Sequence, residues 1–233
     1  MMFLSVFLLL LLPWSLLSAA PSSVRFLAWD EPTAARRLAA GVTPVTGLHP
    51  LQRTGTYKIT VEDGKFQILA LDKKSADGKP LPLVIKVSEN MVRPLVILLP
   101  KADAPTGLTS LVIEDDESSL KWGGIRAFNS TAQELAMSIG NNAKLLPAGW
   151  KPVDFQPDAD QTVPLLIAVP DELRKPADSR KVLFSTVWTG ESNVRSLAII
   201  VPGTDVRLGP VAIKVITEDK RAMEAGKAAE QKR

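Results

Sequence analysis

Beyond residue 20, the chain alternates between short apolar runs and turn-forming residues. The runs are rich in Val, Ile, Leu and Phe, and Gly, Pro, Asp and Asn separate them, as in Glu62–Lys65 (EDGK) and Pro202–Asp205 (PGTD). Runs of this length and spacing predict an all-β sandwich or barrel, and the 18 prolines favour turns and sheet edges over long helices. The predicted strands are Val24–Trp29, Ala35–Ala39, Tyr57–Val61, Phe66–Leu71, Leu83–Val87, Leu95–Leu99, Leu108–Glu114, Ile125–Phe128, Leu135–Ile139, Val163–Val169, Val182–Trp188, Leu197–Val201 and Val211–Ile216.

Two segments also fit a helical pattern. Pro32–Ala40 has a proline near its start, an alanine-rich interior and Gly41 as a stop signal. We nevertheless expect a strand over Ala35–Ala39, because Ala35–Leu38 aligns with Ala136–Ile139 when the two halves of the sequence are compared. The segment Asp219–Arg233 is polar and has no apolar stripe, so we expect at most a frayed surface helix.

The two halves of the sequence share a frame of matching residues. Arg93–Pro100 (RPLVILLP) and Arg195–Pro202 (RSLAIIVP) repeat Arg, Leu, Ile and Pro at the same spacing. Gly107 and Gly209 follow at equal distances, and the next apolar runs end in Glu114-Asp115 and Glu218-Asp219. A period of about a hundred residues has the size of a domain rather than of a solenoid repeat.

We therefore predict two tandem immunoglobulin-like β-sandwich modules that arose by internal duplication. The first module covers residues 23–117, the second covers residues 123–217, and residues 218–233 form a polar C-terminal tail. The alternative is one large β-sandwich to which each copy contributes a part.

The N-terminal segment 1–22 reads as a signal peptide. Phe3–Leu17 is almost wholly apolar, and the small residues Ser18, Ala19 and Ala20 follow it. The run is shorter than the roughly 20 residues that span a bilayer, so cleavage is favoured over an uncleaved anchor. No later segment is long and apolar enough to cross a membrane. We expect a periplasmic or secreted protein.

Composition excludes several classes of function. The chain has no cysteine, which removes disulfides, thiolate metal sites and thiol nucleophiles. The formal net charge is +3, and Lys and Arg are scattered among Asp and Glu rather than clustered, so nucleic-acid binding is not expected. We also find no phosphate-binding glycine loop and expect no cofactor.

Catalytic and metal-binding patterns are weak. His49 is the only histidine, so it cannot form a multi-histidine metal site, and no nucleophile elbow accompanies it. The run Glu114–Glu117 (EDDE) could bind Ca²⁺ or provide a pair of catalytic carboxylates, but it lacks the pattern of a calcium loop. We interpret it as a solvated strand end and expect no metal site and no enzyme activity.

Four tryptophans follow the leader. Trp29 and Trp188 fall in predicted strands and are expected in the core. Trp122 and Trp150 fall in connections beside glycines, so they are the candidates for an exposed binding surface.

Two resemblances bear on function. Ile125–Thr131 (IRAFNST), followed by an alternating strand and Pro147–Gly149 (PAG), resembles uncharacterised exported β-sandwich proteins of Gram-negative bacteria. The general plan also resembles periplasmic pilus chaperones, which consist of two β-sandwich modules. That second resemblance implies an Arg and a Lys near the cleft between the modules that anchor a carboxylate, and Arg25 and Lys121 are the conceivable counterparts.

Three functional hypotheses follow. The first is a non-enzymatic envelope protein that binds or scaffolds a protein partner through sheet edges or the cleft between the modules, with a pilus-chaperone-like protein as one form of it. The second is a carbohydrate-binding module that holds cell-wall polysaccharide on Trp122 and Trp150. The third, a hydrolase that uses Glu114 and Asp115, has the least support.

Overall fold

The computed structural model describes residues 21–205, 207 and 209–230, so the predicted signal peptide lies almost wholly outside the described residues. Strands make up 50% of the chain and helices 9%, which confirms the all-β class. The elements are β1 (Pro21–Ala28), α1 (Glu31–Ala34), β2 (Leu38–Ala40), β3 (Thr43–Val45), β4 (Tyr57–Thr60), β5 (Lys65–Lys74), β6 (Pro80–Lys86), β7 (Pro94–Pro100), β8 (Leu108–Glu114), β9 (Ile125–Asn129), β10 (Leu135–Ile139), β11 (Asn142–Leu146), β12 (Val153–Phe155), β13 (Thr162–Ala168), α2 (Pro170–Leu173), η1 (Ala177–Ser179), β14 (Val182–Thr189), β15 (Val194–Pro202), β16 (Val211–Asp219) and α3 (Lys220–Glu230).

The N-terminal half, residues 21–114, consists of two four-stranded sheets. Their strand orders are β4-β1-β7-β8 and β3-β2-β5-β6. Strand β1 runs parallel to β7, and all other pairs in these sheets are antiparallel. A cluster of buried side chains that includes Phe26, Phe66 and Ile85 fills the space between the two sheets.

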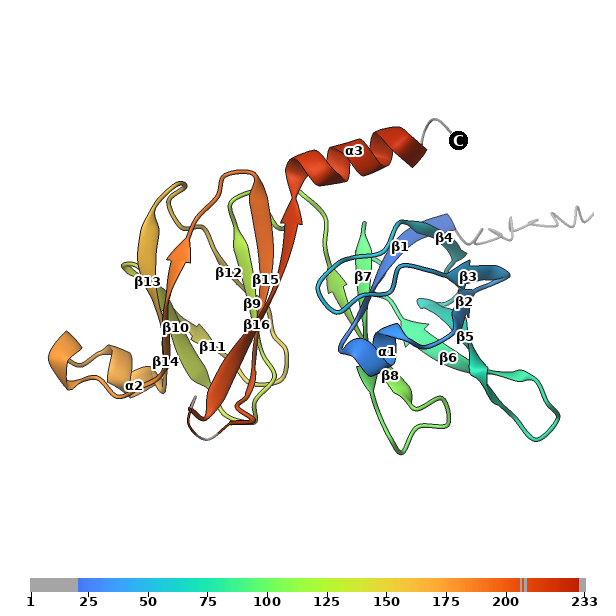
Figure 1. The fold of residues 1–233 in the computed structure, drawn as a ribbon, viewed down its shortest axis with the longest axis horizontal. Coiled ribbons are helices and arrows are strands. Elements are labelled where there is room, and N and C mark those ends of the chain that lie inside the picture. The colour runs from blue at the N-terminus through green and yellow to red at the C-terminus, as the bar shows by residue number, and fades with distance from the viewer. Residues whose placement is uncertain (1–20, 206, 208, 231–233) are drawn as a thin grey trace, which may run out of the picture.

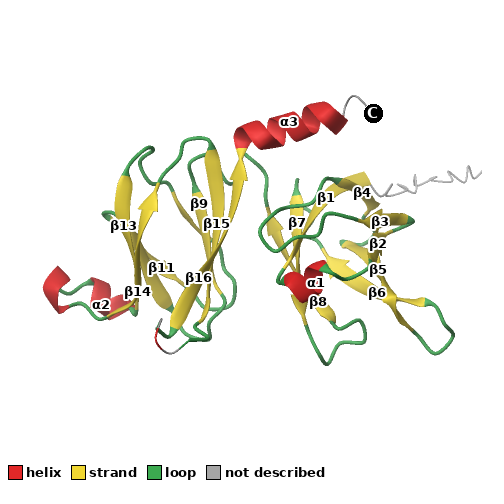
Figure 2. Cartoon of the chain, viewed as in Figure 1, coloured by secondary structure: helices red, strands yellow, loops and turns green. Residues whose placement is uncertain are grey.

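The C-terminal half, residues 125–219, has the same strand order. Its sheets are β12-β9-β15-β16 and β11-β10-β13-β14, and the single parallel pair joins β9 to β15. Each strand of the first half therefore has a counterpart eight positions later in the strand sequence. A second buried cluster, which includes Met137 and Phe155, lies between these sheets. Helices occur only at the periphery of this arrangement (Figure 2).

A third apolar cluster joins the two halves. It contains Leu27, Leu95, Ile97, Ile113, Leu120, Phe128, Leu197, Ile199 and Ile216, which come from β1, β7 and β8 on one side and from β9, β15 and β16 on the other, with Leu120 in the linker. The sheets β4-β1-β7-β8 and β12-β9-β15-β16 consequently pack against each other, and the two halves lie side by side (Figure 1).

The continuous apolar runs in β7 and β15 follow from this layering. In β7, Val96 and Leu98 face the core of the N-terminal half, whereas Leu95 and Ile97 face the cluster between the halves. Side chains alternate across a strand, so a strand that is covered on both faces requires apolar residues at every position. Leu95 to Leu98 are fully buried, as this packing on both faces requires.

Strand pairing corrects one detail of the repeated frame. Leu95 pairs with Ile113 and Leu197 pairs with Ile216, so the residue that corresponds to Glu218 is Asp115, not Glu114. This shift of one residue arises after the matching glycines. Strand β8 begins directly after Gly107, whereas Pro210 separates Gly209 from the start of β16. Both glycines have positive φ angles, +72° and +101°, which a glycine adopts without the strain of a Cβ atom.

Other expectations differ from the structure locally. The strand expected over Ala35–Ala39 is wrong at its start, because helix α1 comes first and Asp30 caps it by accepting a hydrogen bond from the Thr33 amide at 2.9 Å. Strands β3, β11 and β12 were not predicted. The C-terminal tail forms the helix α3 of 11 residues, and Glu218, which was assigned to the tail, belongs to β16.

Candidate functional site

A cavity of about 700 Å³ lies between the two halves. The end of β16 and the starts of β1 and β7 form part of its wall, and the connection between β3 and β4 forms another part. Helix α3 contributes Ala222, Met223 and Gly226 and so covers the cavity from the C-terminal side. The charged or titratable side chains along the wall are Arg25, His49, Arg53, Arg93, Glu218 and Asp219.

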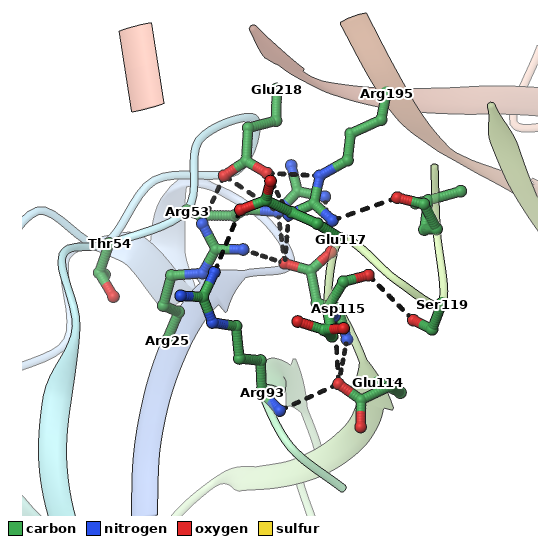
Figure 3. A network of polar contacts seen from close by, with 12 residues as sticks. Arg25, Arg53, Thr54, Arg93, Glu114, Asp115, Glu117, Ser119, Arg195 and Glu218 are labelled. Atoms are coloured by element: carbon green, nitrogen blue, oxygen red, sulfur yellow. Dashed lines mark hydrogen bonds and ion pairs between the residues drawn. The ribbon is translucent and has the colours of Figure 1, made fainter. Parts of the chain in front are cut away.

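Asp115 is the centre of a polar network that shares Arg25, Arg53 and Glu218 with the cavity wall (Figure 3). Its carboxylate is fully buried and accepts two hydrogen bonds from Arg53, from Nε at 2.8 Å and from Nη2 at 3.1 Å. Arg25 also donates to Asp115, and Nη2 of Arg195 lies 3.8 Å from it. Three guanidinium groups therefore surround one buried carboxylate.

Glu218 brings the C-terminal half into the same network. It accepts hydrogen bonds from Arg195, with Nε at 2.7 Å, and from Arg25 of the N-terminal half. Arg53 donates from Nη1 to the Thr217 carbonyl at 3.4 Å, which is a second contact between the halves. Among the described residues, no buried side-chain polar atom of the protein lacks a hydrogen-bond partner.

The guanidinium groups keep both carboxylates ionised. Burial alone would raise the pKa of Asp115, but the charges and hydrogen bonds of Arg53, Arg25 and Arg195 outweigh it and hold this pKa below its usual value. Burial acts in the same sense on Glu218, and the same three arginines lower the pKa of its carboxyl. Neither group is therefore poised to donate a proton near neutral pH.

Arg126 of the C-terminal half makes a contact equivalent to the one between Arg25 and Glu218. Arg126 pairs with Leu197 in the ladder as Arg25 pairs with Leu95. Its Nη1 donates to the Glu114 carbonyl at 2.6 Å, so it too reaches from the first strand of one half to the last strand of the other. The two halves are thus joined by related contacts on corresponding strands.

The acidic run Glu114–Glu117 does not form a ligand set. Glu114 accepts hydrogen bonds from the backbone amides of Val92 and Arg93, and Asp116 accepts one from the Ser118 amide at 2.9 Å. The interpretation of the run as a solvated strand end is wrong for Asp115, which is fully buried. Across the described residues, no group of His, Cys, Asp or Glu side chains is arranged to hold a metal ion.

Arg93 is the most accessible guanidinium on the cavity wall. Its side chain is 42% exposed, compared with 15% for Arg25 and 3% for Arg53. Its ion pair with Glu117, at 3.3 Å, is partly exposed as well, and ion pairs of this kind contribute little to stability.

Of the residues predicted to form a binding surface, Arg25 alone lines the cavity. Lys121 is exposed on the connection between the halves. Trp122 stacks on Arg195, whose guanidinium carbon is 5.1 Å from the ring centroid, and Trp150 packs edge-on against Trp29 at 5.8 Å in the cluster between the halves. No contact brings the two tryptophans together as one sugar platform.

Sequence reasoning missed most of the site. Arg53, Asp115, Arg195 and Glu218 were not predicted as a group, although Asp115, Arg195 and Glu218 were all part of the repeated frame. Arg53 carried no signal, because it lies in an irregular connection and meets Asp115 only in the folded chain.

Comparison with known proteins does not assign the chain to a family. No protein-family model matches the chain, and no curated protein matches it.

Within the described part of the chain, none of the helices has the length and apolar character needed to span a bilayer.

Proposed function

We propose that this protein is a non-enzymatic, exported binding protein that holds an acidic segment of a protein partner in the cavity between its two halves. The observation that carries the proposal is the position of Arg25, Arg53 and Arg93 along the wall of that cavity. Its volume of about 700 Å³ falls within the range of ligand-binding clefts.

The charge balance of the network favours an anionic ligand. Arg25, Arg53 and Arg195 face the two carboxylates of Asp115 and Glu218, so this buried group of five side chains carries one net positive charge, while Asp219 adds a negative charge on the cavity wall. All five groups are buried or nearly so, and an uncompensated charge acts more strongly there than at an open surface. A carboxylate that enters the cavity beside Arg93 would meet an accessible guanidinium, and guanidinium groups bind carboxylates well through two parallel hydrogen bonds.

The groups on the wall and in the network beside it support binding rather than catalysis. Asp115 and Glu218 are held ionised and their oxygens accept hydrogen bonds from arginines. His49 uses Nδ1 to accept the Leu51 amide at 3.0 Å, which fixes its ring within its own loop. No nucleophile and base are paired along this wall in the way that acyl or phosphoryl transfer requires.

We further infer that the two halves are immunoglobulin-like modules related by duplication. The identical strand orders, the single parallel pair in each half and the related contacts of Arg25 and Arg126 support this inference. The duplication would place two copies of one face against each other, as in a symmetric dimer, and the cavity would then have formed at the edge of that contact. Export rests on the leader 1–22.

Affinity capture with matched variants tests the proposal. Residues 23–233 would be immobilised and exposed to cell-envelope extract, and retained proteins would be identified by mass spectrometry. Arg93→Glu reverses the accessible charge of the cavity, and Arg174→Glu, at the residue that follows α2, makes the same change on an exposed side chain elsewhere.

We expect one stoichiometric protein that wild type and Arg174→Glu retain and that Arg93→Glu loses. Equal retention by Arg93→Glu would refute binding in the cavity. Retention of polysaccharide without protein would instead favour the carbohydrate-binding hypothesis, and Trp122→Ala would then be the variant that abolishes it.

A further inference from the structure

The sheet edges of this protein are protected from strand pairing, with one exception. Natural sheets protect exposed edges with proline or with charged side chains, because an open edge offers unpaired backbone groups to another strand. Prolines occupy the edge strands β3 and β6, and charged residues lie within β4, β11, β12 and β16: these residues are Pro44, Pro80, Pro82, Lys58, Lys144, Asp154 and Lys214. Strand β8 carries a charge only at its end, but none of its residues is exposed.

Strand β14 is the exception. Its sequence, VLFSTVWT, contains no proline, glycine or charged residue. It forms a ladder with β13 on one side, and within the described part of the chain no backbone hydrogen bond reaches residues 184–188 from the other side. At Leu183 the edge is partly covered, because Gly209 of the connection between β15 and β16 lies close to the Leu183 carbonyl oxygen. Five of its eight residues are exposed, and Val187 is 66% exposed. The sheet that contains β14 also faces away from the N-terminal half (Figure 1).

We propose that β14 pairs antiparallel with β14 of a second copy of this chain. The two four-stranded sheets would then become one continuous sheet of eight strands, and the backbone groups on the outer side of β14 would gain partners. Because this contact lies on the outer sheet, it leaves the cavity between the halves accessible.

The charges at the two ends of β14 favour a second copy in this orientation. Lys181 precedes the strand and Glu191 follows it, and both are exposed. An antiparallel pair centred on Thr186 places Lys181 of each copy opposite Glu191 of the other. No like charges meet along the pair, because the strand itself carries none, and opposite charges across strands are stabilising.

The corresponding edge of the N-terminal half explains why the assembly would stop at two copies. Strand β6 is the counterpart of β14, and Pro80 and Pro82 remove backbone donors from it. Each chain therefore offers one open edge, and a self-complementary contact through one edge gives a closed dimer rather than a filament.

Sedimentation velocity on residues 23–233 tests the proposal, with Val187→Lys as the disrupting variant. Lysine at this exposed position needs no burial in the monomer but places two positive charges near the axis of the dimer. Val84→Lys is the matched control, since Val84 pairs with β5 as Val187 pairs with β13 and is 48% exposed on the edge that proline protects. We expect the dissociation constant to rise at least about tenfold for Val187→Lys and to stay unchanged for Val84→Lys.

A charge exchange keeps the proposal testable if Val187→Lys fails to fold. Lys181→Glu should weaken the dimer, and adding Glu191→Lys should restore it. A wild-type chain that remains monomeric at about 100 μM would overturn the proposal. So would a dimer that survives Val187→Lys, one that Val84→Lys disrupts equally, or one that the charge exchange does not restore.

Discussion

Replacing Asp115 by Asn isolates the contribution of the buried network. The side chain keeps its volume, but the negative charge at the centre of the network is lost. Arg53 then faces an amide where it had donated two hydrogen bonds to a carboxylate, and Arg25 and Arg195 lose part of their compensation. Glu218 would be left as the one carboxylate among three guanidiniums.

The expected loss is large because little solvent reaches the centre of the network. Asp115 and Arg195 are fully buried, and Arg53 is 3% exposed. Removing one partner of a buried ion pair typically costs about 3–5 kcal/mol, since the remaining charge has neither water nor a counterion. Isolated surface pairs contribute far less, so the size of the effect distinguishes a buried network from a superficial one.

Urea unfolding measures this loss. We expect the midpoint of Asp115→Asn to fall by about 1 M or more at an unchanged slope. Asp205→Asn is the control, because it removes a carboxylate from an exposed pair with Arg207 and should leave the midpoint where it is. A decrease of less than about 1 kcal/mol in the free energy of unfolding of Asp115→Asn would refute the reasoning, since it would be no larger than the contribution of an ordinary hydrogen bond.

Three further predictions concern acid, the apolar contact and two glycines. The lowered pKa values of Asp115 and Glu218 contribute stability that is present above their unfolded-state pKa values of about 4 and is lost as the pH falls through the folded-state values, so acid unfolding followed by circular dichroism should be shallower in Asp115→Asn. Ile199→Ala opens the fully buried cluster between the halves and should cost about 2–5 kcal/mol by urea unfolding while increasing proteolysis of the linker; no change in either would contradict the contact. Gly107→Ala should destabilise by about 1 kcal/mol or more because of its positive φ, whereas Gly226→Ala in α3 should stabilise slightly, and equal effects in thermal unfolding would contradict this account.

The sequence pattern predicted the strands that carry the core. Leu108–Glu114 and Leu135–Ile139 were predicted with the bounds that the structure has, because each combines apolar residues with clear flanking turns. Thr43–Val45, Asn142–Leu146 and Val153–Phe155 were missed. These strands are short or exposed edge strands with few apolar residues, so neighbouring strands rather than an apolar run determine them.

The site was less predictable than the fold. The repeated frame included Arg93 and Arg195 as matching positions, but a pattern along the chain does not show that the fold brings Arg195 beside Asp115. Trp150 was expected at a binding surface, yet its ring packs against Trp29, because the contact between the halves needs apolar area that the individual halves do not reveal.

Site-specific photo-crosslinking tests the central claim most directly. Leu51 lines the cavity and is 50% exposed, whereas Val42 is 99% exposed in the turn between β2 and β3, away from the cavity. A benzophenone side chain at residue 51 should form an adduct with one protein of the cell envelope, an acidic peptide should compete with it, and the same group at residue 42 should form none. The absence of an adduct from residue 51, or the same adduct from both positions, would contradict binding of a partner in the cavity between the halves.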